Sequence, residues 1–226
     1  MKRLSNIFLI LALVLGLMSS PLVAASNYRD GSYIGYVPDK HGDVVIEVTI
    51  AQGRIDQVEI INPIKGENYP SKEAIKFFRQ FPQEVIAKQS TEVDLISGAT
   101  KSYNQYREAT NIALAIASGG YNENLYYGIA KDYEDHGYVL LEVAVDKKMI
   151  KKVEIIPAHD EKKEELAGDK GFRYPYYPAK KLYNDFPKVA VQQQSTDIDI
   201  VSGATVSTDA YNAALKQALE QAGLDL

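Results

Sequence analysis

Two short stretches contain the residues of this chain that are best suited to chemistry. Asp94 to Thr100 has the sequence D-L-I-S-G-A-T, and Asp199 to Thr205 has the sequence D-I-V-S-G-A-T. In each stretch two branched apolar residues predict a short buried strand, Ser-Gly-Ala ends it, and a helical pattern follows. Glycine lets a backbone or a bulky ligand come close, and the unpaired N–H groups of a helix start favour an anion. The sequence therefore predicts two phosphate-binding loops, each with a threonine hydroxyl.

The candidate binding residues are the polar, small and hydroxyl-bearing members of the two motifs. The serines are expected to bond backbone or phosphate, whereas the acidic residues either help to present the threonine or are strand-end or turn carboxylates. The full set is Asp94, Ser97, Gly98, Ala99 and Thr100 in the first motif and Asp199, Ser202, Gly203, Ala204 and Thr205 in the second.

The motif D-x-x-S-G-A-T resembles the one that a flavin transferase modifies in the FMN-binding domains of bacterial sodium-pumping and related redox complexes. The sodium-translocating NADH:quinone reductase contains a domain of this kind, and the tandem pair resembles extracellular bacterial flavin electron-transfer proteins. The resemblance extends over almost all of the mature chain, and both copies keep the full motif. It implies FMN joined through its phosphate to the last threonine, so that Thr100 and Thr205 would carry two covalent FMN groups.

In that family a separate flavin transferase brings FAD and a divalent metal and releases AMP. The threonine is thus a substrate, and the resemblance implies no catalytic residue in this chain. It also implies a membrane electron donor, linked to quinone or to an NADH dehydrogenase, and an acceptor outside the cytoplasm.

Three functions remain open at this point. The first is an exported electron carrier with two covalent flavins, and the second is a flavin-dependent extracellular reductase component. The third is a cofactor-free secreted binding module. The chain contains no separate substrate domain, which favours an electron-transfer protein over a stand-alone enzyme.

The N-terminus has the pattern of a secretory signal peptide over residues 1–25. Lys2 and Arg3 precede the apolar run from Ile7 to Met18, and a small residue, Ala25, stands before Ser26. The alternative is an uncleaved anchor, but the run is shorter than the roughly 20 apolar residues that span a bilayer. The mature protein is therefore expected to begin near Ser26 and to act outside the cytoplasm, associated with the cell envelope.

Composition excludes several classes of protein. The chain has no Cys, so it offers neither a disulfide, a lipidated Cys, a c-type haem nor an iron–sulfur cluster, and redox chemistry requires an organic cofactor. Its net charge of −5 argues against nucleic acid as a partner, because phosphate neutralisation needs a basic face. With 46% hydrophobic and 24% charged residues among 226, it is a folded globular protein of one or two domains.

An internal repeat fixes the expected domain boundaries. Val58-Glu59-Ile60-Ile61 recurs as Val153-Glu154-Ile155-Ile156, and the motif K-G-x-x-Y-P occurs at Lys65 to Pro70 and again at Lys170 to Pro175. The second copy is longer, mostly in the polar stretch from Ala158 to Asp169. The repeat predicts domains at 28–120 and 124–226, joined at Gly119-Gly120.

Each repeat is expected to contain an antiparallel hairpin and two helices. Alternating apolar residues predict strands at 44–50 and 54–61, and at 138–145 and 149–156. Helical spacing covers 71–88 and 179–193, broken by Pro82 and Pro187, and helices should follow the motifs at 102–117 and 207–222. Ser102 with Gln105, and Ser207 or Thr208, are the expected N-terminal caps. The predicted class is α+β, with a sheet and packing helices in each repeat.

Two further recurring pairs are candidates for a site. Tyr69-Pro70 and Tyr174-Pro175 could form the surroundings of a flavin ring, although tyrosine is also common on half-buried sheets. His41 and His136 recur as well, but they have no companion ligands at metal spacing, so they are interpreted as turn residues.

Overall fold

The computed structural model describes residues 28–38, 43–61, 71–94, 98–132, 137–157, 175–199 and 202–225. The predicted signal peptide lies outside these ranges, as do His41, His136, Tyr69, Pro70 and Tyr174. In chain order the elements are β1 (Gly31–Val37), β2 (Val44–Ala51), β3 (Arg54–Ile60), α1 (Lys72–Lys88), α2 (Thr100–Ser118), β4 (Leu125–Lys131), β5 (Tyr138–Asp146), β6 (Met149–Ile155), α3 (Tyr177–Gln193) and α4 (Thr205–Gln221). The predicted α+β class is confirmed.

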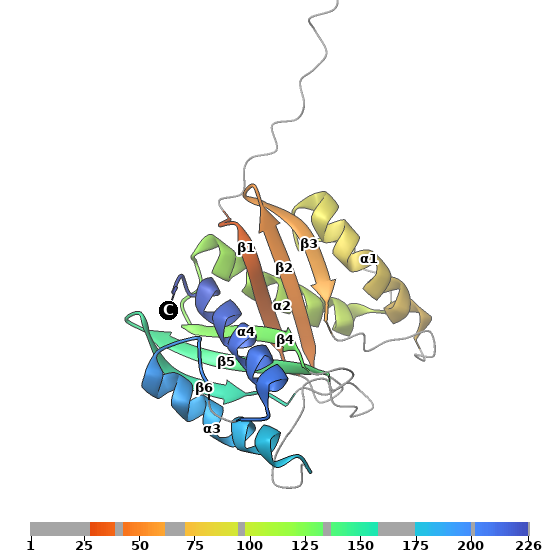
Figure 1. The fold of residues 1–226 in the computed structure, drawn as a ribbon. Coiled ribbons are helices and arrows are strands. Elements are labelled where there is room, and N and C mark those ends of the chain that lie inside the picture. Colours follow the sequence, from red (N-terminus) through yellow and green to blue (C-terminus); the bar gives the residue numbers. More distant parts are fainter. Residues whose placement is uncertain are drawn as a thin grey trace, which may run out of the picture.

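Each repeat forms a three-stranded antiparallel sheet, with order β1-β2-β3 in the first and β4-β5-β6 in the second. In Figure 1 the strands of the two sheets run in crossing directions, and each repeat contributes its own pair of helices. The predicted hairpins are present as β2-β3 and β5-β6, and both carry a register shift at the same place, between Thr49 and Ile50 and between Ala144 and Val145. The prediction omitted the first strand of each sheet, β1 and β4.

The two faces of each sheet are both covered, and the residues of the central strands β2 and β5 are buried or half-buried almost throughout. One face packs against the helices of its own repeat and forms a core, built in the first repeat around Ile46, Val48 and Phe81. The second repeat has the matching core around Leu141, Val143 and Phe186. Alternation of residues along a strand places every second side chain in this core.

Glycines at matching positions let the motif helices lie close on their sheets. A Cβ atom added at Gly35 would lie 1.8 Å from the carbonyl oxygen of Ala109 in α2. One added at Gly128 would lie 1.8 Å from the carbonyl oxygen of Ala214 in α4. Only a residue without a side chain permits this approach of backbone to backbone, and the orientation of α2 and α4 is fixed by it.

Both prolines predicted to break a helix lie inside one. α1 and α3 are continuous through Pro82 and Pro187, so that part of the prediction is wrong. A proline in a helix removes one backbone hydrogen bond and crowds the preceding turn. The adjacent Phe81 and Phe186 are almost fully buried in the two cores, and their packing offsets this cost.

A glutamine ends α1 and α3 and ties each helix to the edge of its sheet. Gln89 and Gln194 are left-handed C-cap residues with φ of 52°. Each side chain pairs with both backbone groups of one strand residue: Gln89 with Ile55 at 2.9 and 2.8 Å, and Gln194 with Ile150 at 2.8 and 2.9 Å. This role explains why glutamine recurs at this position in the two repeats.

The outer faces of the two sheets pack against each other and form a third apolar cluster, the interdomain seam. Its buried members include Ile34, Val45, Tyr127 and Leu140. The rings of Tyr36 and Tyr127 lie 5.2 Å apart across it, and burial raises the pKa of both hydroxyls well above the usual range. The two tyrosines therefore remain neutral.

Two glutamines of α4 join the repeats by hydrogen bonds to strand edges. The Gln221 amide accepts from the Ile34 N–H of β1 at 2.9 Å and donates to the Tyr127 carbonyl of β4 at 2.6 Å. Gln217 accepts from the Ile129 N–H at 2.7 Å and donates to the Glu47 carboxylate at 2.9 Å. Edge strands expose such backbone groups, and these side chains satisfy them.

Replacing Gln221 with Met should therefore destabilise the protein by about 1–3 kcal/mol, because two buried backbone groups lose their partners while the volume is kept. Urea unfolding should show the loss, and hydrogen exchange at the Ile34 amide should accelerate. Gln80→Met, at an exposed position of α1, is the matched control and should change stability by less than about 0.5 kcal/mol. Equal unfolding midpoints for Gln221→Met and the wild type would show that the two hydrogen bonds of the Gln221 side chain do not contribute to stability.

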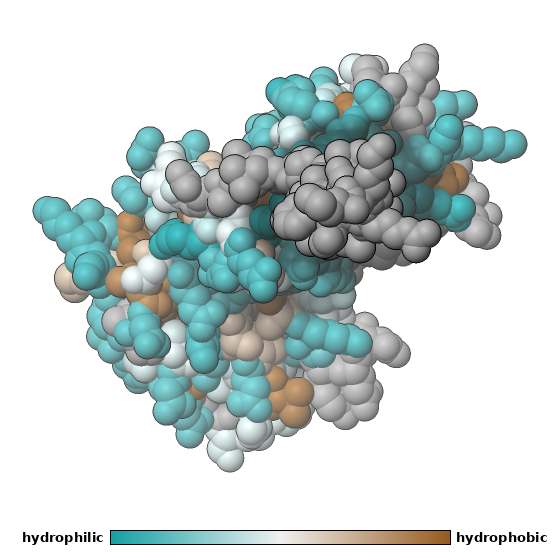
Figure 2. Space-filling view, turned by 90° about the horizontal axis from the view of Figure 1, so that it is seen from above, coloured by the Kyte–Doolittle hydropathy of each residue, from teal (hydrophilic) through white to brown (hydrophobic). Residues whose placement is uncertain are grey.

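Hydrophilic side chains cover most of the face seen in Figure 2, where hydrophobic residues are scattered. Among the described residues no helix has the length and apolar character that a membrane span needs. The exposed large hydrophobic residues in the same ranges are Met149, Tyr176, Tyr177 and Val206.

Candidate functional site

The last threonine of each motif is the first residue of a helix. Thr100 begins α2 and Thr205 begins α4, and both are exposed. The alanine before each threonine is the N-cap and is buried, at 3% exposure for Ala99 and 4% for Ala204. The motif thus anchors its alanine in the core and presents its threonine hydroxyl to solvent.

The predicted caps of these helices are wrong. Ser102 and Ser207 lie inside the first turn and are buried, because the helices begin two residues earlier than expected. The Ser207 hydroxyl donates to Asp132 at 3.1 Å, and the Thr208 hydroxyl donates to the carbonyl of Ala204 at 2.9 Å. Their hydroxyls serve packing within the repeat and leave the helix start to the motif.

Neither helix start is capped by a side chain. Ala99 and Ala204 make no side-chain cap hydrogen bond, and neither first turn contains an acidic residue. The first N–H groups of a helix have no intrahelical acceptor, and the helix dipole adds partial positive charge there. In contrast, α1 is capped by Ser71, whose hydroxyl accepts from the Ala74 N–H at 3.1 Å. The two motif helices therefore fit a phosphate group at their first turn.

The glycine of each motif has a left-handed backbone, with φ of 88° at Gly98 and 93° at Gly203. Each lies against the first turn of the preceding helix: an added Cβ would lie 3.3 Å from Glu73 Cγ in the first repeat. In the second repeat the nearest atom would be the Tyr176 hydroxyl, also at 3.3 Å. Both backbone conformation and space therefore favour glycine here.

Tyr176 holds the second motif in place. Its hydroxyl donates a hydrogen bond of 2.6 Å to the carbonyl of Gly203, while its side chain is half exposed. Neither Tyr176 nor its counterpart Ser71 was among the site residues predicted from the sequence. The available signal was their position directly after the recurring Lys-Gly-x-x-Tyr-Pro segment, whose last residue, Pro175, is exposed.

The acidic residues of the motifs lie in different surroundings. Asp94 is exposed and accepts from Lys88 at 2.9 Å, whereas the position of Lys88 is occupied in the second repeat by Gln193. Asp199 and Ser202 are exposed, and Ser97 lies outside the described residues. The roles predicted for these residues remain predictions.

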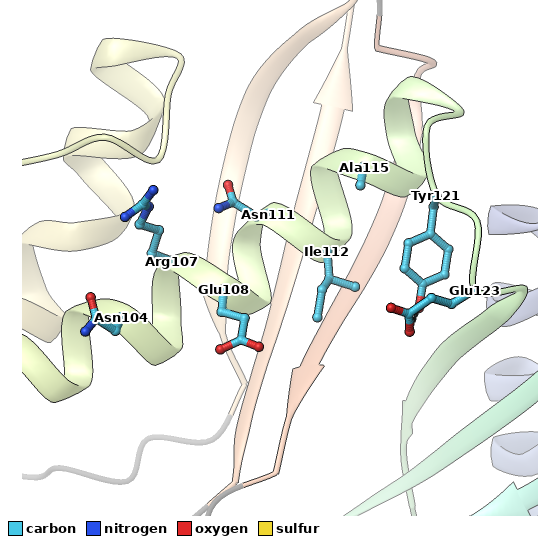
Figure 3. Close-up of a pocket in the computed structure, with 8 residues that line it drawn as sticks. All are labelled: Asn104, Arg107, Glu108, Asn111, Ile112, Ala115, Tyr121 and Glu123. Atoms are coloured by element: carbon cyan, nitrogen blue, oxygen red, sulfur yellow. Dashed lines mark hydrogen bonds between the residues drawn. The ribbon is translucent and has the colours of Figure 1, made fainter.

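A groove of about 450 Å³ lies along the outer face of α2 (Figure 3). Asn104, Glu108 and Ala115 line it from the helix, and Tyr121 and Glu123 close it from the following segment. Because residues four apart share a helix face, the groove begins one turn beyond Thr100. The groove is a surface feature that is open to solvent. In the described ranges no cluster of three metal-ligating side chains occurs.

The chain has recognisable relatives among known proteins. The model of the FMN-binding domain matches residues 39–115 and again residues 135–220. The chain is also similar to a crystallographically solved protein of Clostridium perfringens, with 26% identity over 42% of this chain and 93% of that one, at a TM-score of 0.33. No curated protein matches at a significant level. Two matches that together span most of the chain, each including one motif and its helix, show that this protein belongs to the FMN-binding domain family, with two copies of the domain in tandem.

Proposed function

We propose that the protein is an exported electron carrier that holds two FMN groups, each joined by a phosphoester to the hydroxyl of Thr100 or Thr205. A flavin transferase attaches both groups. The protein then accepts electrons from a membrane donor, linked to quinone or to an NADH dehydrogenase, and gives them to an acceptor outside the cytoplasm.

One observation carries this proposal. In both repeats the first residue of a helix without a side-chain cap is a threonine whose side chain is exposed. The backbone N–H groups of that turn can receive phosphate oxygens, and their dipole favours the negative charge. The buried alanine and the left-handed glycine hold the loop so that the hydroxyl faces an approaching enzyme. These features support attachment at the threonine.

Covalent attachment serves retention. A dissociable cofactor is lost by dilution outside the cytoplasm, whereas a tethered one stays at high effective concentration. The chain has no Cys, so the flavin would supply the redox chemistry, accepting one or two electrons. The protein residues bind its phosphate, orient it and set the charge around it.

The proposal is tested by following electrons through the purified, flavin-loaded protein. Membrane vesicles with reduced quinone should bleach its flavin absorbance in a stopped-flow experiment, and a soluble ferric acceptor should restore it. The control is the chain with both Thr100→Ala and Thr205→Ala, which should show no such signal. A loaded protein whose flavin never changes redox state with any membrane preparation would rule out the carrier function.

A further inference from the structure

The surroundings of the two attachment threonines differ in charge although the backbone around them is the same. Four positions are compared in each repeat. Two lie in the motif helix: the residue directly after the threonine and the residue one turn later. The other two are the first two residues of the helix that contacts the motif glycine, α1 or α3. In the first repeat they are Lys101, Asn104, Lys72 and Glu73, and in the second Val206, Asp209, Tyr177 and Pro178.

These positions lie beside the site in both repeats. Lys101 and Val206 directly follow the threonine in the helix, and both are exposed. Glu73 and Pro178 approach the motif glycines, with Cγ atoms 3.3 and 3.7 Å from the added Cβ. Surface charges act over a Debye length of about 8–10 Å, so groups this close to the attachment point contribute to the local field.

The resulting difference amounts to two unit charges. At these four positions the first repeat has two lysines and one glutamate, a net charge of +1, whereas the second repeat has one aspartate, a net charge of −1. Tyr177 and Val206 are two of the four exposed large hydrophobic residues in the described part of the chain, and both positions are lysines in the first repeat. The second site is therefore both more apolar and more negative.

Charged groups close to a flavin shift its reduction potential. Reduction of a flavin at neutral pH takes up two electrons and one proton and leaves a negative charge on the ring. A nearby cation stabilises that charge, and a nearby anion or an apolar wall opposes it. The site with the lysines therefore favours the reduced form.

We infer that the two flavin sites have different reduction potentials, with the higher one at Thr100, so that the first electron pair entering the protein resides there. This inference rests on the proposed function, since it needs a flavin at each threonine. It adds an internal order: the group at Thr205 is reduced second and is the stronger reductant toward an outside acceptor.

The test uses chains that each carry one flavin, Thr205→Ala for the first site and Thr100→Ala for the second, after intact-mass measurement has confirmed loading. Potentiometric titration with dithionite should give a higher midpoint for the flavin at Thr100. Exchanging the residues that follow the threonines should reduce the difference between the two midpoint potentials. Lys101→Val should lower the midpoint potential of the flavin at Thr100, and Val206→Lys should raise that of the flavin at Thr205.

Two controls show whether charge is the cause. Lys216→Val removes a charge about three turns from Thr205 along α4, beyond a Debye length, and should leave the midpoint unchanged. Raising the salt concentration should shrink the gap. The inference would be overturned if the two midpoint potentials were equal, if their order were reversed, or if neither exchange changed them. Each of these results would leave the proposed function intact. Chains that carry no flavin in the mass measurement would overturn both.

Discussion

Thr100→Ala and Thr205→Ala should each remove one FMN group from the chain, and the double variant should remove both. The reason is that the phosphoester requires the hydroxyl, and each repeat presents its own at a separate helix start. The measurement is the intact mass of protein co-expressed with a flavin transferase and washed under denaturing conditions. Ultraviolet fluorescence in a denaturing gel should fall in step with the mass.

Serine substitution should retain attachment because it keeps the hydroxyl. Stability should change by less than about 0.5 kcal/mol in every variant, because the side chains are exposed. Thr49→Ala, on the seam face of β2, controls for loss of a threonine elsewhere and should keep both groups. Two groups on Thr205→Ala, or one on the double variant, would show that the last threonine is not the attachment point. A wild-type protein with only one FMN group would show that the motif alone is insufficient for attachment. The residue after the threonine, Lys101 or Val206, would then be the first to test as the cause.

Gly128→Ala should destabilise the second repeat by about 3 kcal/mol or more, a large share of the about 5–15 kcal/mol that holds a protein folded. The added methyl group would lie 1.8 Å from the Ala214 carbonyl oxygen and 2.7 Å from its carbon, so α4 would have to move off β4. Since α4 begins at Thr205, the same shift should disturb the second attachment site.

The measurement is urea unfolding monitored by circular dichroism, together with flavin loading at each threonine. Gly120→Ala is the matched control: it is exposed, and its nearest neighbouring atom, the Ser118 hydroxyl oxygen, lies at 3.4 Å. Its unfolding midpoint should match the wild type. A Gly128→Ala protein as stable as the wild type would mean that strand and helix separate easily, contrary to the packing described.

The hairpins and the class were predictable because their strands alternate, whereas β1 and β4 were not. Tyr33, Ile34 and Gly35 are buried in succession, since one face of β1 meets α2 and the other meets the seam. A strand covered on both sides has no polar alternation to detect. The prolines misled the helix prediction for a related reason, because the core packing that keeps α1 and α3 continuous is a property of the tertiary structure.

The motif itself could be found from sequence, but its geometry could not. Ser102 and Ser207 carry the usual signal of a helix cap, whereas the true N-caps, Ala99 and Ala204, carry none. The absence of a side-chain cap is the feature that leaves backbone N–H groups available at the threonine. The role of Tyr176 could not be predicted from the sequence, because its partner, the Gly203 carbonyl, is a backbone group that is distant in the chain.

The two glutamines of α4 make the repeats unlike each other at their contact. The positions of Gln217 and Gln221 are Ile112 and Ile116 in the first repeat. Two identical copies with isoleucine at both places would leave the backbone of Ile34, Ile129 and Tyr127 without these partners. The first repeat thus offers the Ile34 N–H and the Glu47 carboxylate, and the second repeat supplies the glutamines that pair with them. Removal of either copy would therefore leave polar groups of the other without their partners, so that each repeat completes the hydrogen bonding of its neighbour.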